Sequence, residues 1–167
     1  MQPSSMNRPE FVAVFGDIFE HSPWIAEQAW DSGLDTRHDC AEGLHLVFAS
    51  VIHAADEDHK LSLLRSHPEL AIGIAGREEL TAASQAEQQA AGLDQCSRDE
   101  FMEFWQLNES YRGRFGFPFI MAVKGYGRHE ILQAMRTRLA NTREQEFQTA
   151  LKQVILIGLF RIESKFE

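Results

Sequence analysis

The clearest candidate for acid–base chemistry lies in residues 66–70, which read SHPEL. His67 is the one histidine of the chain that precedes a proline. We expect a helix to end there, because the ring of Pro68 disfavours a helical conformation in the residue before it. A histidine at a helix end can face a pocket, and an imidazole that titrates near neutrality is suited to proton transfer. A surface histidine beside a helix stop is the alternative interpretation of these residues.

A second candidate lies in residues 84–88, which read SQAEQ. Ser84, Glu87 and Gln88 are spaced i, i+3 and i+4, so in a helix they share one face. That face would present a hydroxyl, a carboxylate and an amide to a ligand, and Glu87 would be free to orient or charge a nearby imidazole. The alternative is a solvated helix face on which Ser84 acts as a cap.

Residues 114–123, RFGFPFIMAV, are too apolar for an exposed loop. Gly116, Pro118 and the β-branched residues favour an extended segment over a helix. If such a segment is buried, its backbone groups need partners, and a polar ring ligand could supply some of them. Plain hydrophobic packing of an irregular segment is the competing explanation.

Metal binding is conceivable at a cluster formed by His53, Asp56, Asp58 and His59. The steps from His53 to Asp56 and from Asp56 to His59 are both i, i+3, which can place ligands on one helix face. The cluster lacks the HExxH pattern, and acidic residues beside a histidine are common on solvated helix faces. We therefore expect no metal here.

Apolar positions recur at helical spacing over most of the chain, and strict alternation is nowhere sustained, so we expect an all-α fold. The predicted architecture is a single-domain bundle of about seven to nine helices over residues 1–167, without an internal repeat or a linker. Residues 69–80 contain Gly73 and Gly76 and are expected to form a loop.

Capping residues predict where several helices begin. The expected caps are Asn7, Ser22 before Pro23, Thr81 or Ser84, Ser97 with Glu100, and Asn141 with Glu144. The helix after Ser97 is expected to bury one stripe of side chains. That stripe includes Phe101, Phe104, Trp105, Leu107 and Tyr111.

Composition narrows the classes of partner. With 167 residues, 44% hydrophobic and 25% charged, the chain has the composition of one globular domain. Sixteen basic against 25 acidic residues give a net charge of −9, which disfavours nucleic acid and anionic membranes. Cys40 and Cys96 stand far apart, which excludes a disulfide framework and favours the cytoplasm. We expect no signal peptide, membrane span or terminal SKL peroxisomal signal.

Several motifs spread along the chain occur together, and in this order they resemble one family, the 2-oxo-4-hydroxy-4-carboxy-5-ureidoimidazoline (OHCU) decarboxylases. The resemblance extends from Asn7 through Trp24 to the last helix. Its motifs are LLRSHPELA at 63–71, SQAEQ at 84–88 with AGL at 91–93, residues 104–111 with Asn108, RFGFPF at 114–119, Glu146 with Phe147, and Arg161 with Ile162.

The resemblance implies an all-helical domain that decarboxylates OHCU to (S)-allantoin in urate degradation, without a metal or any other cofactor. It also implies a small-molecule substrate and a homodimer. Because the chain lacks the peroxisomal signal, it resembles the bacterial members of the family. By the same resemblance His67 is the catalytic acid or base and Glu87 its partner. The implied substrate contacts are Pro68, Ser84, Gln88, Phe119, Ile120, Met121, Ala122, Val123 and, on a less distinctive motif, Arg161.

Two mechanisms and two other functions stay open. In one mechanism His67 and Glu87 divide the proton transfers; in the other Glu87 deprotonates the substrate hydroxyl first and His67 only steers the carboxylate. A helical interaction domain without enzymatic activity is the main alternative function, because the chain has 12 phenylalanines and aromatic patches mark interfaces. A metal-dependent hydrolase that uses His53, Asp56 and His59 is a more distant one.

Overall fold

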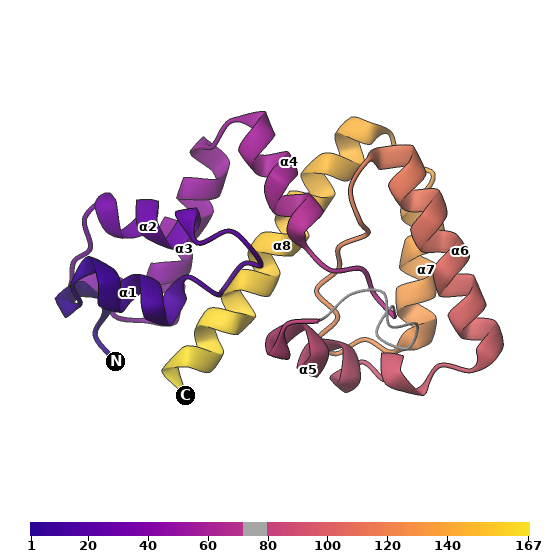
Figure 1. The fold of residues 1–167 in the computed structure, drawn as a ribbon, viewed down its shortest axis with the longest axis horizontal. Helices are drawn as coiled ribbons and strands as arrows, with labels where there is room; N and C mark the ends of the chain where they lie inside the picture. Colours follow the sequence, from indigo (N-terminus) through magenta and orange to yellow (C-terminus); the bar gives the residue numbers. More distant parts are fainter. Residues whose placement is uncertain (72–79) are drawn as a thin grey trace. The chain divides into compact units, whose positions relative to one another are not determined.

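The computed structural model describes residues 1–71 and 80–167, which form eight α-helices, three short 3-10 helices and no strand (Figure 1). This confirms the all-α prediction. The α-helices are α1 (Arg8–Phe15), α2 (Trp24–Asp31), α3 (Ala41–Ala54), α4 (Glu57–Ser66), α5 (Ala82–Ala90), α6 (Arg98–Phe115), α7 (Arg128–Arg138) and α8 (Arg143–Phe166). The 3-10 helices are η1 (Pro3–Ser5), η2 (Thr36–His38) and η3 (Leu93–Gln95).

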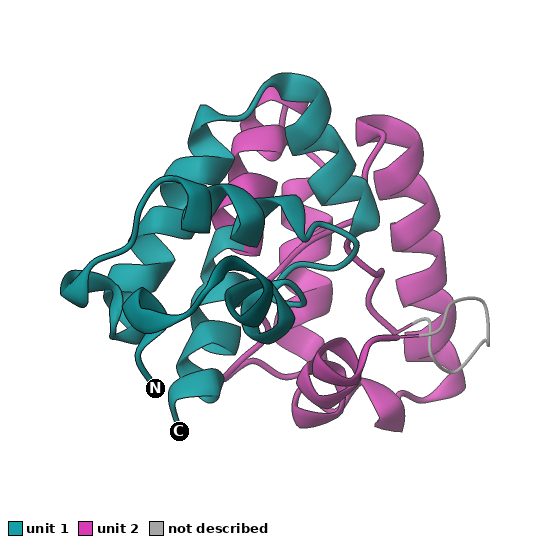
Figure 2. Cartoon of the chain, turned by 60° about the vertical axis from the view of Figure 1, so that its left-hand side comes forward, with its two compact units in different colours: residues 1–66, 155–167 teal, residues 67–154 magenta. Residues whose placement is uncertain are grey.

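The chain divides into two compact units (Figure 2). Unit 1 contains residues 1–66 and 155–167, and unit 2 contains residues 67–154. The boundary between Val154 and Ile155 lies inside α8, so this helix contributes to both units. A single domain over the whole chain stays a prediction.

Aromatic packing forms the core of unit 1. α1 begins at Asn7, whose side chain accepts from the backbone N–H of Glu10 at 3.0 Å while the Glu10 carboxylate accepts from Asn7 N–H. This reciprocal capping box fixes the start of α1 as the sequence predicts. One turn apart on α1, Phe11 and Phe15 meet Phe48 of α3 edge to face, with ring centroids 6.2 and 6.4 Å away.

In unit 2, α6 organises the packing. It begins at the predicted capping box of Ser97 and ends at Gly116, whose φ of 80° is left-handed and costs glycine little. Tyr111 of α6 contacts the ring of Phe119 with centroids 5.4 Å apart. The apolar segment after α6 therefore folds back onto the buried face of this helix, and residues 116–123 are not helical, as predicted.

The buried face of α6 differs from the predicted stripe. Its buried residues are Phe104, Asn108, Tyr111 and Phe115. Trp105, which we expected inside, is 38% exposed, because it lies one residue away from the stripe of Phe104 and Asn108. The buried stripe therefore contains a polar side chain, Asn108, that the predicted stripe did not include.

The predicted cap of α2 is wrong. The Ser22 hydroxyl donates to the carbonyl of Glu20 at 3.1 Å, and α2 follows Pro23 without a side-chain cap. Ser22 is 3% exposed, so its hydroxyl takes the partner that the buried turn offers.

The predicted cap of α8 is also wrong. The Thr142 hydroxyl, and not Asn141, accepts from the backbone N–H of Gln145 at 3.2 Å, and the Gln145 side chain accepts from Thr142 N–H at 3.0 Å. The side chain of Asn141 instead donates to the buried carboxylate of Glu146 at 2.8 Å. A hydrogen bond to a buried carboxylate five residues further on thus takes the place of the predicted cap.

Two predictions concern other parts of the chain. The loop expected around Gly73 and Gly76 lies outside the described residues. None of the helices among the described residues combines the length and apolar character that crossing a membrane requires.

Candidate active site

His67 follows directly after the last residue of α4, Ser66, as Pro68 predicts. The side chain is buried, with 7% of the residue exposed. This excludes the interpretation of His67 as a surface histidine beside a helix stop. An imidazole inside the protein can exchange a proton with a bound ligand, which is the geometry that acid–base chemistry needs.

Side chains from two helices hold the backbone just after His67. The Gln88 amide of α5 binds it twice, since Oε1 accepts from Ala71 N–H at 3.0 Å and Nε2 donates to the Glu69 carbonyl at 3.1 Å. Between these two, Asn108 Nδ2 of α6 donates to the Leu70 carbonyl at 2.9 Å. Three consecutive residues are thereby fixed by side chains. We call residues 67–71 the histidine turn.

The histidine turn ends in an unusual conformation. Ala71 has a φ of 62°, a left-handed value that costs a residue with a Cβ about 1–2 kcal/mol. Such conformations persist where the surroundings fix them, and they cluster at functional sites. The turn is also held through the Glu69 carboxylate, which forms an ion pair of 2.9 Å with Arg112 of α6.

α5 presents the predicted polar face toward the interior. Thr81 caps the helix by accepting from the backbone N–H of Ser84 at 3.3 Å. Thr81 is therefore the cap, and the Ser84 side chain, 2% exposed, lies on the same buried face as Gln88. Glu87 is half-buried beside them.

A small cavity borders this face of α5. Its volume is about 160 Å³, enough for a few water molecules or a small ligand group. It is lined by Ala71, Leu80, Gln85, Gln88, Gln89, Leu93 and Asp94. The cavity therefore reaches Ala71 at the end of the histidine turn, and of the predicted polar face of α5 only Gln88 lines it.

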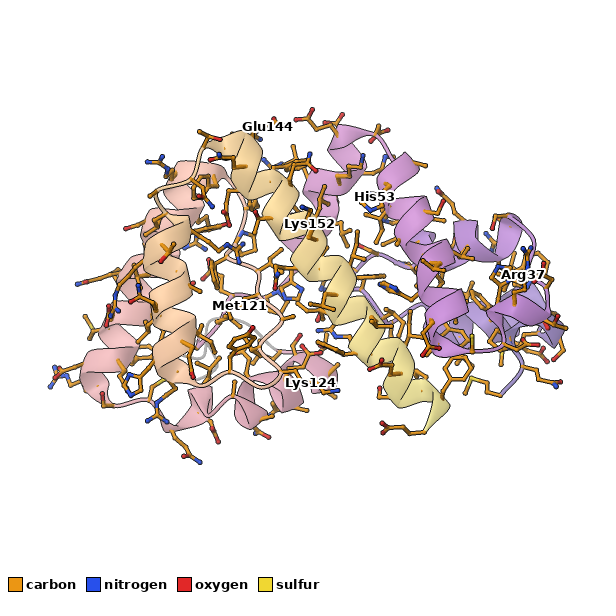
Figure 3. The ribbon with its side chains drawn as sticks, turned by 180° about the vertical axis from the view of Figure 1, so that it is seen from behind. Arg37, His53, Met121, Lys124, Glu144 and Lys152 are labelled. Atoms are coloured by element: carbon orange, nitrogen blue, oxygen red, sulfur yellow. The ribbon has the colours of Figure 1, made fainter. Side chains whose placement is uncertain are left out.

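The segment between α6 and α7 is anchored at two backbone groups. Arg138 Nη1 donates to the carbonyl of Ile120 at 2.7 Å, and Gln153 Oε1 of α8 accepts from Ala122 N–H at 2.9 Å. Met121, labelled in Figure 3, lies between the two anchors and is half-buried. The extended chain is thus held by side chains in place of a helix or sheet ladder.

Arg138 belongs to a buried charged network in unit 2. Its Nε donates to the Glu146 carboxylate at 2.6 Å, and the Tyr111 hydroxyl donates to the same oxygen. Glu146 is fully buried, so its charge depends on these partners. Burial and the hydrogen bond to Glu146 raise the pKa of Tyr111 well above its usual value, which keeps the phenol neutral.

Arg161, the remaining predicted substrate contact, lies in unit 1. It is 6% exposed, its Nη2 lies 2.9 Å from a carboxylate oxygen of Glu20, and its Nη1 donates to the Ile18 carbonyl at 2.9 Å. Glu20 is also buried. Because its carboxylate has the opposite charge to the Arg161 guanidinium, the pair carries little net charge. All the other predicted site residues belong to unit 2.

At the candidate metal cluster, His59 makes local contacts with Asp56. Asp56 accepts from the backbone N–H of His59 at 2.8 Å and lies 2.7 Å from its ring Nδ1. The backbone N–H and then the ring hold the pKa of Asp56 below its usual value. Over residues 1–71 and 80–167, no group of three or more His, Cys, Asp or Glu side chains could hold a metal ion.

Sequence reasoning missed the residues that hold the backbone of the site. Asn108, Arg138 and Gln153 each bind a main-chain group of a segment that carries predicted site residues, from positions far along the chain. The available signal was a polar residue on an otherwise apolar helix stripe, as at Asn108. Such a residue is buried at a cost unless it is hydrogen-bonded, so it points to a specific partner.

The fold and this site define a helical protein with a buried histidine suited to acid–base chemistry. The family model described as OHCU decarboxylase matches residues 4–163. The chain therefore belongs to the OHCU decarboxylase family, as the resemblance indicated.

Individual relatives agree with this assignment. The chain is 40% identical over 165 residues to the 2-oxo-4-hydroxy-4-carboxy-5-ureidoimidazoline decarboxylase of Haloferax volcanii, covering 99% of this chain and 94% of that protein. It is 39% identical over 159 residues to the uric acid degradation bifunctional protein of Bacillus subtilis, covering 95% of this chain and 31% of that protein. A crystal structure of (S)-allantoin synthase matches with a TM-score of 0.74 and 32% identity, covering 98% of this chain and 52% of that one.

Proposed function

We propose that this chain decarboxylates OHCU to (S)-allantoin in urate degradation. The observation that carries the proposal is the buried His67 on a turn fixed by side chains, in a member of the OHCU decarboxylase family. Its relatives include an OHCU decarboxylase, a uric acid degradation protein and an (S)-allantoin synthase, and these names together support the substrate, the pathway and the product.

The substrate carries a carboxylate on the ring carbon that also bears a hydroxyl, beside a ring C=N bond. When carbon dioxide leaves, the electron pair of the broken C–C bond moves toward that C=N bond, so the substrate supplies its own electron sink and needs no cofactor for it. The ring nitrogen of that C=N bond receives the electron pair and takes up a proton, and the resulting enol-like intermediate becomes allantoin when the hydroxyl loses its proton and the neighbouring ring carbon gains one. The protein has to supply an acid and a base held against the ring.

His67 and Glu87 supply that acid and base. His67 acts on one face of the ring, so one enantiomer forms, and Glu87 is its partner in the proton transfers. The burial of His67 and the position of Glu87 on the helix that binds the histidine turn support this division. In the rival version Glu87 removes the hydroxyl proton first and His67 steers the carboxylate. The first version predicts that His67→Asn loses turnover, whereas the rival version predicts that His67→Asn keeps far more turnover than Glu87→Gln.

The remaining predicted contacts bind the substrate. Pro68, Ser84 and the backbone of residues 119–123 face its ring and ureido groups. Gln88 holds the histidine turn, but an amide nitrogen carries two hydrogens, so it can also donate to the substrate. Arg161 offsets substrate charge to the extent that Glu20 leaves its guanidinium available.

The test generates the labile substrate in place from urate, with urate oxidase and the hydrolase that follows it. Adding this protein should speed the appearance of optically active allantoin, followed by circular dichroism. A signal no faster and no more chiral than in the protein-free control would contradict the proposed function.

The family resemblance also supports a homodimer, and the two free thiols, Cys40 and Cys96, support a reducing compartment, the cytoplasm. Light scattering coupled to size-exclusion chromatography measures the mass of the protein in solution and so tests the homodimer. A mass equal to one chain at micromolar concentration would contradict the dimer.

A further inference from the structure

Asn108 occupies a place where an apolar side chain would pack more readily. It lies on the buried stripe of α6 between Phe104 and Tyr111, and it is 4% exposed. A buried amide is costly unless its polar atoms are hydrogen-bonded. Its nitrogen donates to the Leu70 carbonyl at 2.9 Å, while its buried Oδ1 has no hydrogen-bond partner among the described residues. The polar contribution of the Asn108 side chain is therefore its hydrogen bond to the Leu70 carbonyl.

The same face of α6 holds the histidine turn twice. Arg112 lies one helical turn after Asn108, at i+4, and pairs with the Glu69 carboxylate. α6 thus binds two consecutive residues of the turn, one through the backbone and one through the side chain. Gln88 binds the flanking groups from α5.

The left-handed residue explains why so many side chains are needed. Ala71 would relax to an ordinary φ if its neighbours allowed it. Gln88 fixes the N–H of Ala71, and Asn108 fixes the carbonyl of Leu70, so both sides of the peptide bond that joins them are held. This peptide is the third one after Pro68, so holding it limits how far the histidine turn, and with it His67, can shift.

We propose that Asn108 is a positioning residue for His67: it holds the Leu70 carbonyl and so fixes the histidine turn. The inference rests on the proposed function, in which His67 transfers protons. It deepens that function, because Asn108 acts through the turn and touches neither the substrate nor the reacting atoms.

The first test replaces Asn108 by Leu, which keeps the approximate shape of the side chain, suits the apolar stripe and removes the amide that donates to Leu70. A displacement of a reacting group by about 1 Å can lower a rate about 100-fold, so we expect kcat to fall about 10- to 100-fold while KM stays within about twofold. Gln106→Leu is the matched control, because Gln106 is an exposed amide on the same helix. It should retain wild-type kcat.

A second variant, Asn108→Asp, keeps the shape and a polar side chain but replaces the donor by a carboxylate oxygen. We expect the same loss of kcat. If either variant unfolds, the substitution is measured in an Ala71→Gly background, where the left-handed φ costs little. Its kcat should still lie at least about tenfold below that of Ala71→Gly alone.

The kcat–pH profile separates positioning from a general structural role. If Asn108 acts through His67, the profile of Asn108→Leu departs from the wild-type one, whereas the profile of Gln106→Leu does not. An unchanged profile, or wild-type kcat in a folded Asn108→Leu protein, would overturn the inference. Wild-type protein without activity would instead overturn the proposed function, and Asn108 would then have only a structural role.

Discussion

Buried polar side chains in unit 2 serve mainly to hold backbone. Gln88, Asn108 and Arg138 each bind a carbonyl of a non-helical segment, and these segments carry His67 and the predicted substrate contacts. A carbonyl outside a helix or sheet needs another donor when it is buried. The side-chain amides and guanidinium supply it, which lets an all-α protein keep irregular backbone inside.

Tyr111 should make stability fall at alkaline pH. Its pKa is raised in the folded state, so the unfolded chain releases this proton first, and stability declines as pH rises above about 10, the ordinary pKa of a phenol. In Tyr111→Phe this contribution is absent. The difference in unfolding free energy between wild type and variant, measured by urea denaturation, should therefore shrink between pH 9 and pH 11. A constant difference would show that the phenol titrates normally.

Glu146→Gln should destabilise the protein by about 3 kcal/mol, because it leaves the guanidinium of Arg138 buried without its carboxylate. The loosened Arg138 also releases the Ile120 carbonyl, so KM should rise. Glu144→Gln is the control on the same helix, at an exposed position labelled in Figure 3, and should change stability by less than about 0.5 kcal/mol. Equal thermal midpoints for the two variants would contradict the network.

Close packing of α8 on the turn after α1 depends on a glycine. A Cβ at Gly158 would lie 2.4 Å from the Phe19 ring, so Gly158→Ala should cost about 1–3 kcal/mol of stability. Gly113, in α6, has open space around its Cβ position, and Gly113→Ala should stabilise the protein by about 0.5–1 kcal/mol. Thermal unfolding of the two variants should thus shift in opposite directions, and a stabilised Gly158→Ala protein would contradict the packing.

Helix ends were predictable where the signal is local. Pro68 stops α4, and Ser97 with Glu100 begins α6, because each effect depends on residues within one turn. The caps predicted at Ser22 and Asn141 failed because each side chain has a competing partner close by in the chain. Ser22 donates to the Glu20 carbonyl and Asn141 to the buried carboxylate of Glu146, and a single sequence does not show the burial that decides between such partners.

The fold class and the family followed from periodicity and motifs, whereas the support of the site did not. His67 and Glu87 stand in short, distinctive motifs, and both lie in unit 2 with residues 119–123. Asn108 and Gln153 bind segments that are 38 and 31 positions away along the chain. Only the packed structure brings such residues together, and the left-handed Ala71 could not be predicted because alanine gives no signal for it.

The whole protein should work without a metal ion, because the proposed chemistry uses an acid, a base and the electron sink of the substrate. Elemental analysis of the purified protein should find no stoichiometric zinc, iron or manganese. Dialysis against a chelator should leave the rate of allantoin formation unchanged. Loss of activity that returns with one of these metals would contradict this account and revive the hydrolase interpretation of His53, Asp56 and His59.

Comparing His67→Asn with Glu87→Gln tests the central claim most directly. Both variants remove the acid–base group and keep nearly the same shape. The initial rate of optically active allantoin formation is measured for each, on substrate generated in place. Proton transfer by His67 predicts that His67→Asn falls to the protein-free rate and loses the handedness of the product. Substantial, enantioselective turnover by His67→Asn, with Glu87→Gln inactive, would contradict it and establish Glu87 as the base that acts alone.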